Sequence, residues 1–170
     1  MIPVRNIYYM LAYAFQVLHE QGYKDVAAED FQNAAELLAA ILCKGVSVQI
    51  KRGLCRQYIT KEESLASPRG KLEIGESIKT QVFRKKQLVC AYDEFSVNAY
   101  SNRIIKTTMA VLLRADISKT RKKEIRKLLV FFDGVDTLNA HNINWNIHYD
   151  RNNQSYRMII EVCRFVLKGL

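Results

Sequence analysis

The sequence predicts an α+β fold that is predominantly helical, with N-terminal and C-terminal helices around a small antiparallel sheet. Apolar residues recur at helical spacing in residues 1–55 and again in residues 98–170. Residues 56–97 are instead rich in aromatic and β-branched side chains and contain a turn signal, which favours strands. With 49% hydrophobic residues and only 7 glycines and 2 prolines, the chain can bury a sizeable core. We therefore expect a single domain over residues 1–170.

The N-terminal part of the chain is expected to form two helices. Pro3 suits the first turn of a helix, because its missing N–H would be unpaired there anyway, and Gly22 ends this helix. The second helix begins near Asp30 and places its leucines and isoleucines on one face. Its end is left open, because residues 46–50 alternate between apolar and polar positions as a strand does.

The middle of the chain is expected to form the small sheet. Aromatic and β-branched residues predict strands over residues 57–64 and 87–95. Residues 67–70, with the sequence SPRG, are a turn signal between them. Apolar residues four positions apart also indicate a short helix over residues 76–83.

The last part of the chain is expected to contain three helices and one strand. An amphipathic helix covers residues 98–114, and Ser118 can cap the next helix with its hydroxyl. Strict alternation over residues 143–149 predicts a half-buried strand. The final helix runs from Tyr156 to the chain end, and its exit through Gly169 is typical of a helix that leads into further chain. We therefore expect a truncated or excised sequence.

The sequence shows no sign of a membrane span or a secretory signal. The longest apolar stretches are interrupted by charged or polar residues before they reach the roughly 20 residues that a membrane helix needs. The N-terminus lacks the basic start and the cleavage site of a signal peptide. We expect a cytoplasmic protein without membrane contact.

The positive charge of the chain is unevenly distributed. The net charge of +9 divides into −2 over residues 1–50, +4 over residues 51–100 and +7 over residues 101–170. Such an excess favours nucleic acid or an acidic protein surface as a partner, and the alternative is a solvated cationic face. The residues that we single out as candidate nucleic-acid ligands form a stripe at helical spacing: Lys119, Lys122, Lys123 and Arg126.

Motifs for catalysis or for a bound cofactor are missing from the sequence. A phosphate-binding loop would end in Gly-Lys-Ser/Thr, and no such loop occurs. A metal-dependent restriction nuclease uses an Asp/Glu-x-Lys unit, and no acidic residue has lysine two positions later. The four cysteines lack metal-ligand spacing and are interpreted as buried reduced thiols. We expect no catalytic residue, no metal and no cofactor in this chain.

Five segments resemble the N-terminal half of the McrC-type subunit of McrBC modification-dependent, methylcytosine-specific restriction systems. They occur in the family's order and span nearly the whole chain. The segments are IPVRNIYYMLAYAF at 2–15, KGVSVQIKRGL at 44–54, RGK at 69–71, NRIIKTTMAVL at 102–112 and YRMIIEVCRFVL at 156–167.

The resemblance implies a partner rather than an enzyme. McrC-type subunits join a ring of McrB, an AAA+ GTPase that reads methylated DNA, and they stimulate its GTP hydrolysis. Their nuclease, with its Mg²⁺, lies in the C-terminal half. Its motif, an acidic residue followed by Asp-Ala-Lys, is missing here. We therefore expect the nuclease domain to be absent, GTP to bind to the partner, and DNA to be present only in the assembled complex.

The candidate partner-binding residues lie in the predicted turn. Arg69 and Lys71 flank Gly70 in the RGK segment, where an exposed charged tip can enter a cleft of another subunit. The alternative is that Gly70 only shapes a hairpin and that its neighbours are solvated. Arg5 and Asn6 are second candidates. A DNA-binding module that uses the Lys119 stripe is the alternative function from a different class.

Overall fold

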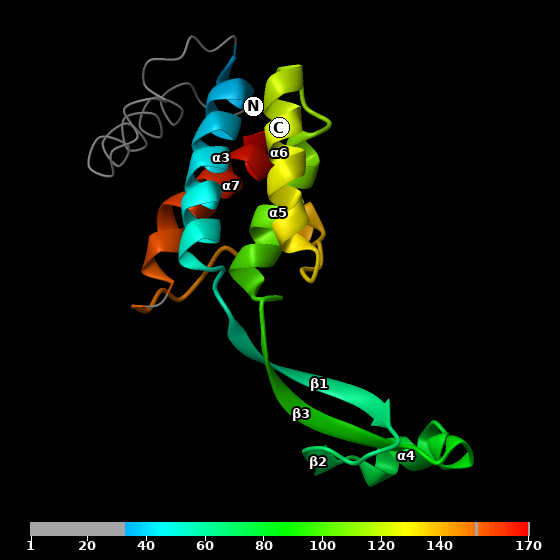
Figure 1. Ribbon diagram of the computed structural model, residues 1–170. Coiled ribbons are helices and arrows are strands. Elements are labelled where there is room, and N and C mark those ends of the chain that lie inside the picture. Colours follow the sequence, from blue (N-terminus) through cyan, green and yellow to red (C-terminus); the bar gives the residue numbers. More distant parts are fainter. Residues whose placement is uncertain (1–32, 152, 170) are drawn as a thin grey trace. The chain divides into compact units, whose positions relative to one another are not determined.

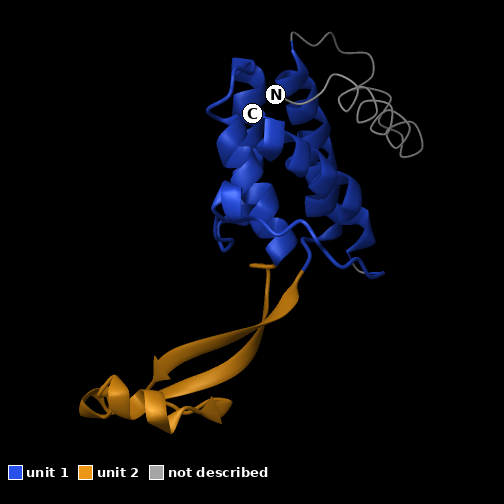
Figure 2. Cartoon of the chain, turned by 180° about the vertical axis from the view of Figure 1, so that it is seen from behind, with its two compact units in different colours: residues 1–55, 100–170 blue, residues 56–99 orange. Residues whose placement is uncertain are grey.

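A computed structural model describes residues 33–151 and 153–169, in which the chain forms two compact units (Figure 1). Unit 1 comprises residues 1–55 and 100–170, and unit 2 comprises residues 56–99 (Figure 2). The helix expected after Pro3 lies outside the described residues. Five α-helices and a three-stranded antiparallel sheet occur in the described part of the chain, which confirms the predicted α+β class.

Unit 1 is a bundle of four helices with a continuous apolar core. The helices are α3 (Ala34–Arg52), α5 (Tyr100–Leu112), α6 (Lys119–Leu129) and α7 (Arg157–Gly169). Helix α3 packs against α6 and α7, and α5 packs against α6 and α7. The largest fully buried side chains include Ile41, Leu42, Ile104, Ile105, Met109, Leu112, Ile125, Phe132, Tyr156, Ile159 and Ile160. Short 3-10 turns follow α6 and precede α7: Val130–Phe132, Ala140–Asn142 and Gln154–Tyr156.

Helix α3 continues through the segment whose strand-like alternation left its end open. Asn33 caps the helix by accepting a hydrogen bond from the Glu36 amide at 2.9 Å, and Gly53 ends it at a φ of 93°. Gly45 lies inside the helix where α7 approaches closely, because a Cβ there would lie 2.9 Å from Cγ1 of Ile159. The apolar side chains of residues 46–50 therefore belong to a helix that is covered by its neighbours.

Helices α5 and α6 match the sequence prediction closely. Every residue expected on the buried face of α5 is buried: Ile104, Ile105, Thr108, Met109 and Leu112. Ser118 caps α6, because its hydroxyl accepts a hydrogen bond from the Arg121 amide at 3.1 Å. The amphipathic pattern thus identified both the helices and the faces that they bury.

The strand predicted over residues 143–149 is wrong. Ile143 is buried and the polar residues between the apolar ones are exposed, so the alternation of burial is present. The backbone, however, makes local bonds instead of a strand ladder. The Asn144 amide donates to the Tyr100 hydroxyl at 2.8 Å, and the Asn146 amide donates to Oδ1 of Asn144 at 2.9 Å. Asparagine side chains compete for backbone groups in this way, and the segment packs on unit 1 without a partner strand among the described residues.

Unit 2 is built on a long two-stranded ribbon. Strand β1 (Gln57–Leu65) pairs antiparallel with β3 (Leu88–Ser96), from Gln57 opposite Ser96 to Leu65 opposite Leu88. The two-residue strand β2 (Lys71–Leu72) adds to the other edge of β3, which gives the order β1-β3-β2. Both long strands were predicted, whereas β2 was not.

A short helical segment connects β2 to β3. Helix α4 (Ile74–Lys79) is followed by a 3-10 turn, η1 (Val82–Lys85), so the helix predicted over residues 76–83 is divided in two. Gln81 divides it, because its φ of 52° is left-handed. The Ser77 hydroxyl fastens α4 to the sheet by accepting from the Val89 amide at 2.8 Å and donating to the Glu73 carbonyl at 2.9 Å. Within residues 33–151 and 153–169, every helix is too short or too polar to cross a membrane.

Candidate functional site

The predicted turn at residues 69–71 is exposed, and Gly70 is locked against the sheet. Gly70 has a φ of 68°, a left-handed conformation that favours glycine. A Cβ at this position would collide with the carbonyl oxygen of Ala91 and would lie 2.7 Å from Cβ of Tyr92. The turn therefore requires glycine for two reasons, its backbone conformation and its close approach to β3.

Arg69 is held over an aromatic ring. Its guanidinium carbon lies over the Tyr92 ring, 4.3 Å from the ring centroid, which is a cation–π distance. Desolvation and a hydrogen bond to Glu63 raise the pKa of Tyr92, so its hydroxyl stays protonated at neutral pH. Among the described residues, no carboxylate forms an ion pair with Arg69. Arg69 thus presents a guanidinium that is held over Tyr92 and whose charge is not neutralised by any described carboxylate.

Lys71 is engaged differently. Its Nζ lies 2.6 Å from Oε1 of Glu73. The hydrogen bond to Glu73 and the attraction of that carboxylate raise the pKa of Lys71. The side chain is exposed, but its charge is compensated locally. Of the two cations that flank Gly70, Arg69 is therefore the one that is available to an outside anion.

The stripe on α6 is the second candidate surface. Lys119, Lys123 and Arg126 are exposed and Lys122 is half-buried, so the helix presents these residues on one face as expected. Arg121, which lies within the same run, instead contacts Glu36 of α3, with a side chain that is only 14% exposed. The stripe belongs to unit 1 and the turn at residues 69–71 to unit 2. Arg5 and Asn6 lie outside the described residues.

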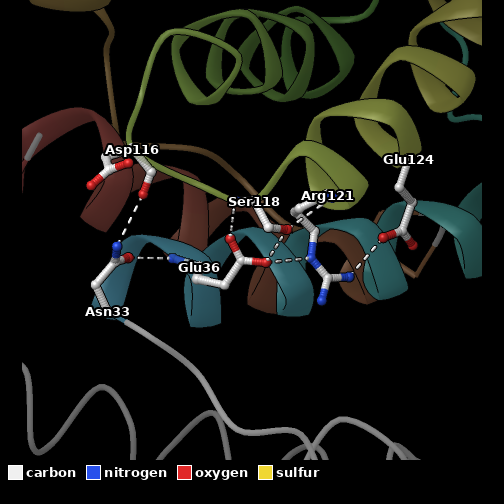
Figure 3. Close-up of polar contacts among 6 residues, drawn as sticks. All are labelled: Asn33, Glu36, Asp116, Ser118, Arg121 and Glu124. Carbon is white, nitrogen blue, oxygen red and sulfur yellow. Dashed lines mark hydrogen bonds and ion pairs between the residues drawn. The ribbon is translucent and has the colours of Figure 1, made fainter.

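A polar bracket that sequence reasoning missed joins the starts of α3 and α6 (Figure 3). Glu36 accepts hydrogen bonds from the Ser118 amide at 2.8 Å, the Ser118 hydroxyl at 3.0 Å and Nε of Arg121 at 3.3 Å. Arg121 also binds Glu124 at 2.6 Å, and the Asn33 amide group donates to the Asp116 carbonyl at 3.0 Å. The carboxylate of Glu36 thus lies at the N-terminus of α6, where the exposed amides favour negative charge.

The pKa of Glu36 reflects two opposing effects. Burial by itself would raise the pKa of this carboxyl group. The hydrogen bonds from Ser118 and Arg121 and the charge of Arg121 outweigh burial, and the pKa is lowered. The sequence analysis did not single out Glu36, because its partners Ser118 and Arg121 lie 82 and 85 residues away along the chain.

The described residues do not bring together the groups that a metal site requires. Within residues 33–151 and 153–169, no three His, Cys, Asp or Glu side chains cluster closely enough to hold a metal ion. Cys43, Cys90 and Cys163 are buried and Cys55 is half-buried, and all four are free thiols. Burial raises the pKa of Cys43 and of Cys163 to about 12, so these thiols are protonated at neutral pH. Protonated thiols serve as core residues here.

Two solved structures from McrBC assemblies share this fold. The cryo-EM structure of the Thermococcus gammatolerans McrBC complex matches with a TM-score of 0.63 and 20% identity, over 86% of this chain and 45% of the matched chain. A half-complex of the tetradecameric assembly of T. gammatolerans McrB AAA+ hexamers with bound McrC matches with a TM-score of 0.62 and 20% identity, over 81% and 34%. At this identity the likeness establishes the fold that the protein shares with chains of these complexes.

The sequence establishes the family. Residues 4–170 match the family model described as McrBC 5-methylcytosine restriction system component. The type IV methyl-directed restriction enzyme EcoKMcrBC of Escherichia coli K12 is 31% identical over 170 residues, which are 99% of this chain and 49% of that protein. The chain therefore belongs to the McrBC 5-methylcytosine restriction system component family, as the five sequence segments indicated. It spans about half the length of this relative.

Proposed function

We propose that this chain is the region of an McrC-like subunit that docks on an McrB-like AAA+ GTPase ring and stimulates its GTP hydrolysis. The observation that carries the proposal is the turn at residues 69–71, where Gly70 fixes the backbone and Tyr92 orients Arg69. An arginine supplied from a neighbouring chain is a common way to stabilise the charge that develops during phosphoryl transfer. A related structure contains McrB AAA+ hexamers with bound McrC, which supports a ring as the partner.

Arg69 has the chemistry that this role requires. A guanidinium group presents a planar fork of donors that can bind phosphate or carboxylate oxygens in pairs. Because Arg69 forms no ion pair among the described residues, it can exchange the Tyr92 contact for an anion on the partner. Lys71 is assigned a supporting role, since Glu73 already neutralises its charge. GTP and its Mg²⁺ would belong to the partner.

The proposal also states what this chain does not do. With no Asp/Glu-x-Lys unit in the sequence, we propose that it cuts no DNA by itself. The nuclease and its Mg²⁺ would reside in the C-terminal half of a complete McrC-like subunit. Methylated DNA would then be met only in the assembled complex.

The test is the steady-state GTPase rate of the partner at increasing concentrations of this chain. We expect the double variant Arg69→Ala, Lys71→Ala to lose most of the stimulation. Its free energy of unfolding should stay within about 0.5 kcal/mol of that of the parent, as is usual for exposed residues. Arg69→Lys should restore little, because lysine keeps the charge but not the planar fork. The matched control is Arg126→Ala with Lys127→Ala, which removes one arginine and one lysine from α6.

The outcomes separate the candidate functions. Full stimulation by the double variant would show that the turn is structural, and the search would move to Arg5 and Asn6. Loss of stimulation in the α6 control alone would assign the contact to the stripe. The second candidate function, sequence-independent DNA binding by the stripe, predicts instead a DNA affinity that falls steeply as salt rises.

A further inference from the structure

The far end of unit 2 carries a cationic tip, defined as Phe83, Arg84, Lys85 and Lys86. The ribbon runs from the Gln57–Ser96 pair to the Leu65–Leu88 pair, and the tip directly precedes β3 at the Leu65–Leu88 end. Figure 1 shows β1 and β3 leading to α4 and the adjoining turn at this end. All four tip residues are exposed.

The tip has a defined conformation. Val82 is buried and anchors the turn, and left-handed residues bracket it, Gln81 with a φ of 52° and Lys86 with a φ of 55°. The Lys86 amide donates to the Phe83 carbonyl at 2.9 Å, and the Gln87 amide donates to the Val82 carbonyl at 3.2 Å. The turn therefore directs three consecutive cations outward from one short, hydrogen-bonded loop.

The charges of unit 2 are segregated, with three consecutive cations at the tip. No Asp or Glu occurs between Ser77 and Tyr92. Other lysines of the unit have acidic partners: Lys61 pairs with Glu94, Lys71 with Glu73 and Lys79 with Glu76. In the described part of the chain, Arg84, Lys85 and Lys86 form no ion pair. A merely solvated surface would be expected to interleave both signs of charge, as the rest of unit 2 does.

Large apolar side chains accompany these cations. Phe83 is 48% exposed, and Ile78, at the end of α4, is 61% exposed. An exposed aromatic ring beside arginine and lysine offers a stacking surface for a base together with positive charge for the phosphates. Three consecutive cations with no acidic residue beside them match the regularly spaced phosphates of a nucleic acid strand, and the adjacent ring matches its bases.

We propose that the tip binds nucleic acid, with Arg84, Lys85 and Lys86 on the phosphates and Phe83 against a base. The strand contacted would be single-stranded or locally unpaired, because the ring must reach the face of a base. This site lies on unit 2, distinct from the α6 stripe and from the turn at residues 69–71. It goes beyond the proposed function, and its main test, the binding of a labelled oligonucleotide, uses neither the GTPase partner nor GTP.

The experiment measures fluorescence anisotropy of a fluorescein-labelled single-stranded oligonucleotide, and of the duplex of the same sequence, with the full chain at several salt concentrations. We expect Arg84→Gln, Lys85→Gln, Lys86→Gln to weaken single-strand binding by at least about tenfold at low salt. The slope of log affinity against log salt should fall by about 2, as loss of three phosphate contacts predicts. Phe83→Ala should weaken binding by about tenfold and leave the slope unchanged, because stacking is insensitive to salt.

The matched control removes the same charges from the other unit. Lys51→Gln, Arg114→Gln, Lys168→Gln also replaces one arginine and two lysines, all exposed and all outside the α6 stripe. It should retain most of the affinity of the parent. Equal losses in both triple variants would reduce the effect to net charge and overturn the site, and loss in the control alone would assign binding to unit 1 and overturn it as well.

Two further outcomes are decisive. A tip variant that binds DNA like the parent but no longer stimulates the GTPase would show that an acidic protein surface occupies the tip, and the nucleic-acid site would be rejected. Melting temperature is recorded for every variant, and Lys85→Glu, a single exposed substitution, repeats the test if the triple variant does not fold. Retained single-strand affinity in a folded Lys85→Glu chain would count equally against the proposal.

Discussion

Replacing Gly70 with alanine is expected to destabilise unit 2 by about 2–5 kcal/mol. The left-handed backbone at a φ of 68° costs a residue with a Cβ about 1–2 kcal/mol. The added methyl group would also collide with the Ala91 carbonyl and lie 2.7 Å from Cβ of Tyr92, and such overpacking costs about 1–3 kcal/mol. Because both obstacles are parts of β3 near its backbone, neither can rotate away as a flexible side chain would.

The assay is hydrogen exchange of the backbone amides of unit 2. The Glu73 amide, which donates to the Val89 carbonyl at 2.9 Å, reports whether β2 stays docked, and amides of α5 serve as an internal reference. Gly53 has a positive φ of 93°, but no atom lies within 4 Å of a Cβ added there. The variant Gly53→Ala therefore shows the cost of backbone strain without a steric clash. Gly75→Ala has neither problem and should be neutral or stabilising. Protection of Glu73 that is unchanged in Gly70→Ala would refute the reasoning.

Two predictions concern unit 1. Glu36→Gln should lower its stability by about 1–3 kcal/mol at pH 7, because hydrogen bonds to a charged carboxylate are lost. The pKa of Glu36 in the folded chain is lowered from its ordinary value of 4.5. The stability that the Glu36 carboxylate contributes is therefore present above pH 4.5 and is lost as the pH falls through the folded pKa. Melting curves should thus converge on acidification, and a constant gap from pH 7 to pH 3 would contradict this account. Ile105→Asp should lower the free energy of unfolding, measured with urea, by about 4 kcal/mol or more, because it places an unpaired carboxylate in the core. The control Arg114→Asp changes an exposed residue and should have little effect. Equal stability of the two variants would show that the assigned face of α5 is wrong.

Sequence reasoning succeeded where one local pattern decides the structure. Helix α5 has an apolar face and a polar face at helical spacing, and Ser118 precedes α6 at the position where a hydroxyl caps a helix. The long strands β1 and β3 carry the aromatic and β-branched residues that favour extended backbone. The turn at Gly70 was recognised because glycine and proline mark turns strongly.

Prediction from the sequence failed where alternating apolar and polar residues were interpreted as a strand. The alternation over residues 143–149 correctly indicates which side chains are buried. A strand also needs a neighbouring strand to pair with, and none occurs there among the described residues. The same signal in residues 46–50 belongs to α3, which is covered on several sides by α6 and α7. There Val46 and Gln49 are buried and Val48 and Ile50 are half-buried, so a short alternation of apolar residues does not by itself identify a strand.

The candidate site was only partly accessible to sequence. Arg69, Gly70 and Lys71 were identified, but the sequence could not reveal that Tyr92 orients Arg69 while Glu73 neutralises Lys71. The bracket of Glu36 was missed because its partners are far away along the chain. Contacts of this kind are determined by the packing of whole helices, for which one sequence holds no local signal.

Unit 2 is an insertion within unit 1, since the chain leaves after Cys55 and returns at Tyr100. The departure and return points are neighbours, because Nδ2 of Asn102 donates to the Cys55 carbonyl at 2.8 Å. Because the two ends of the insertion are held close together by unit 1, lengthening the insertion adds only a small entropic cost of loop closure. Evolution can therefore lengthen, shorten or exchange residues 56–99 without rebuilding the bundle. It follows that the length and surface of residues 56–99 can change while the core of the helical body stays the same.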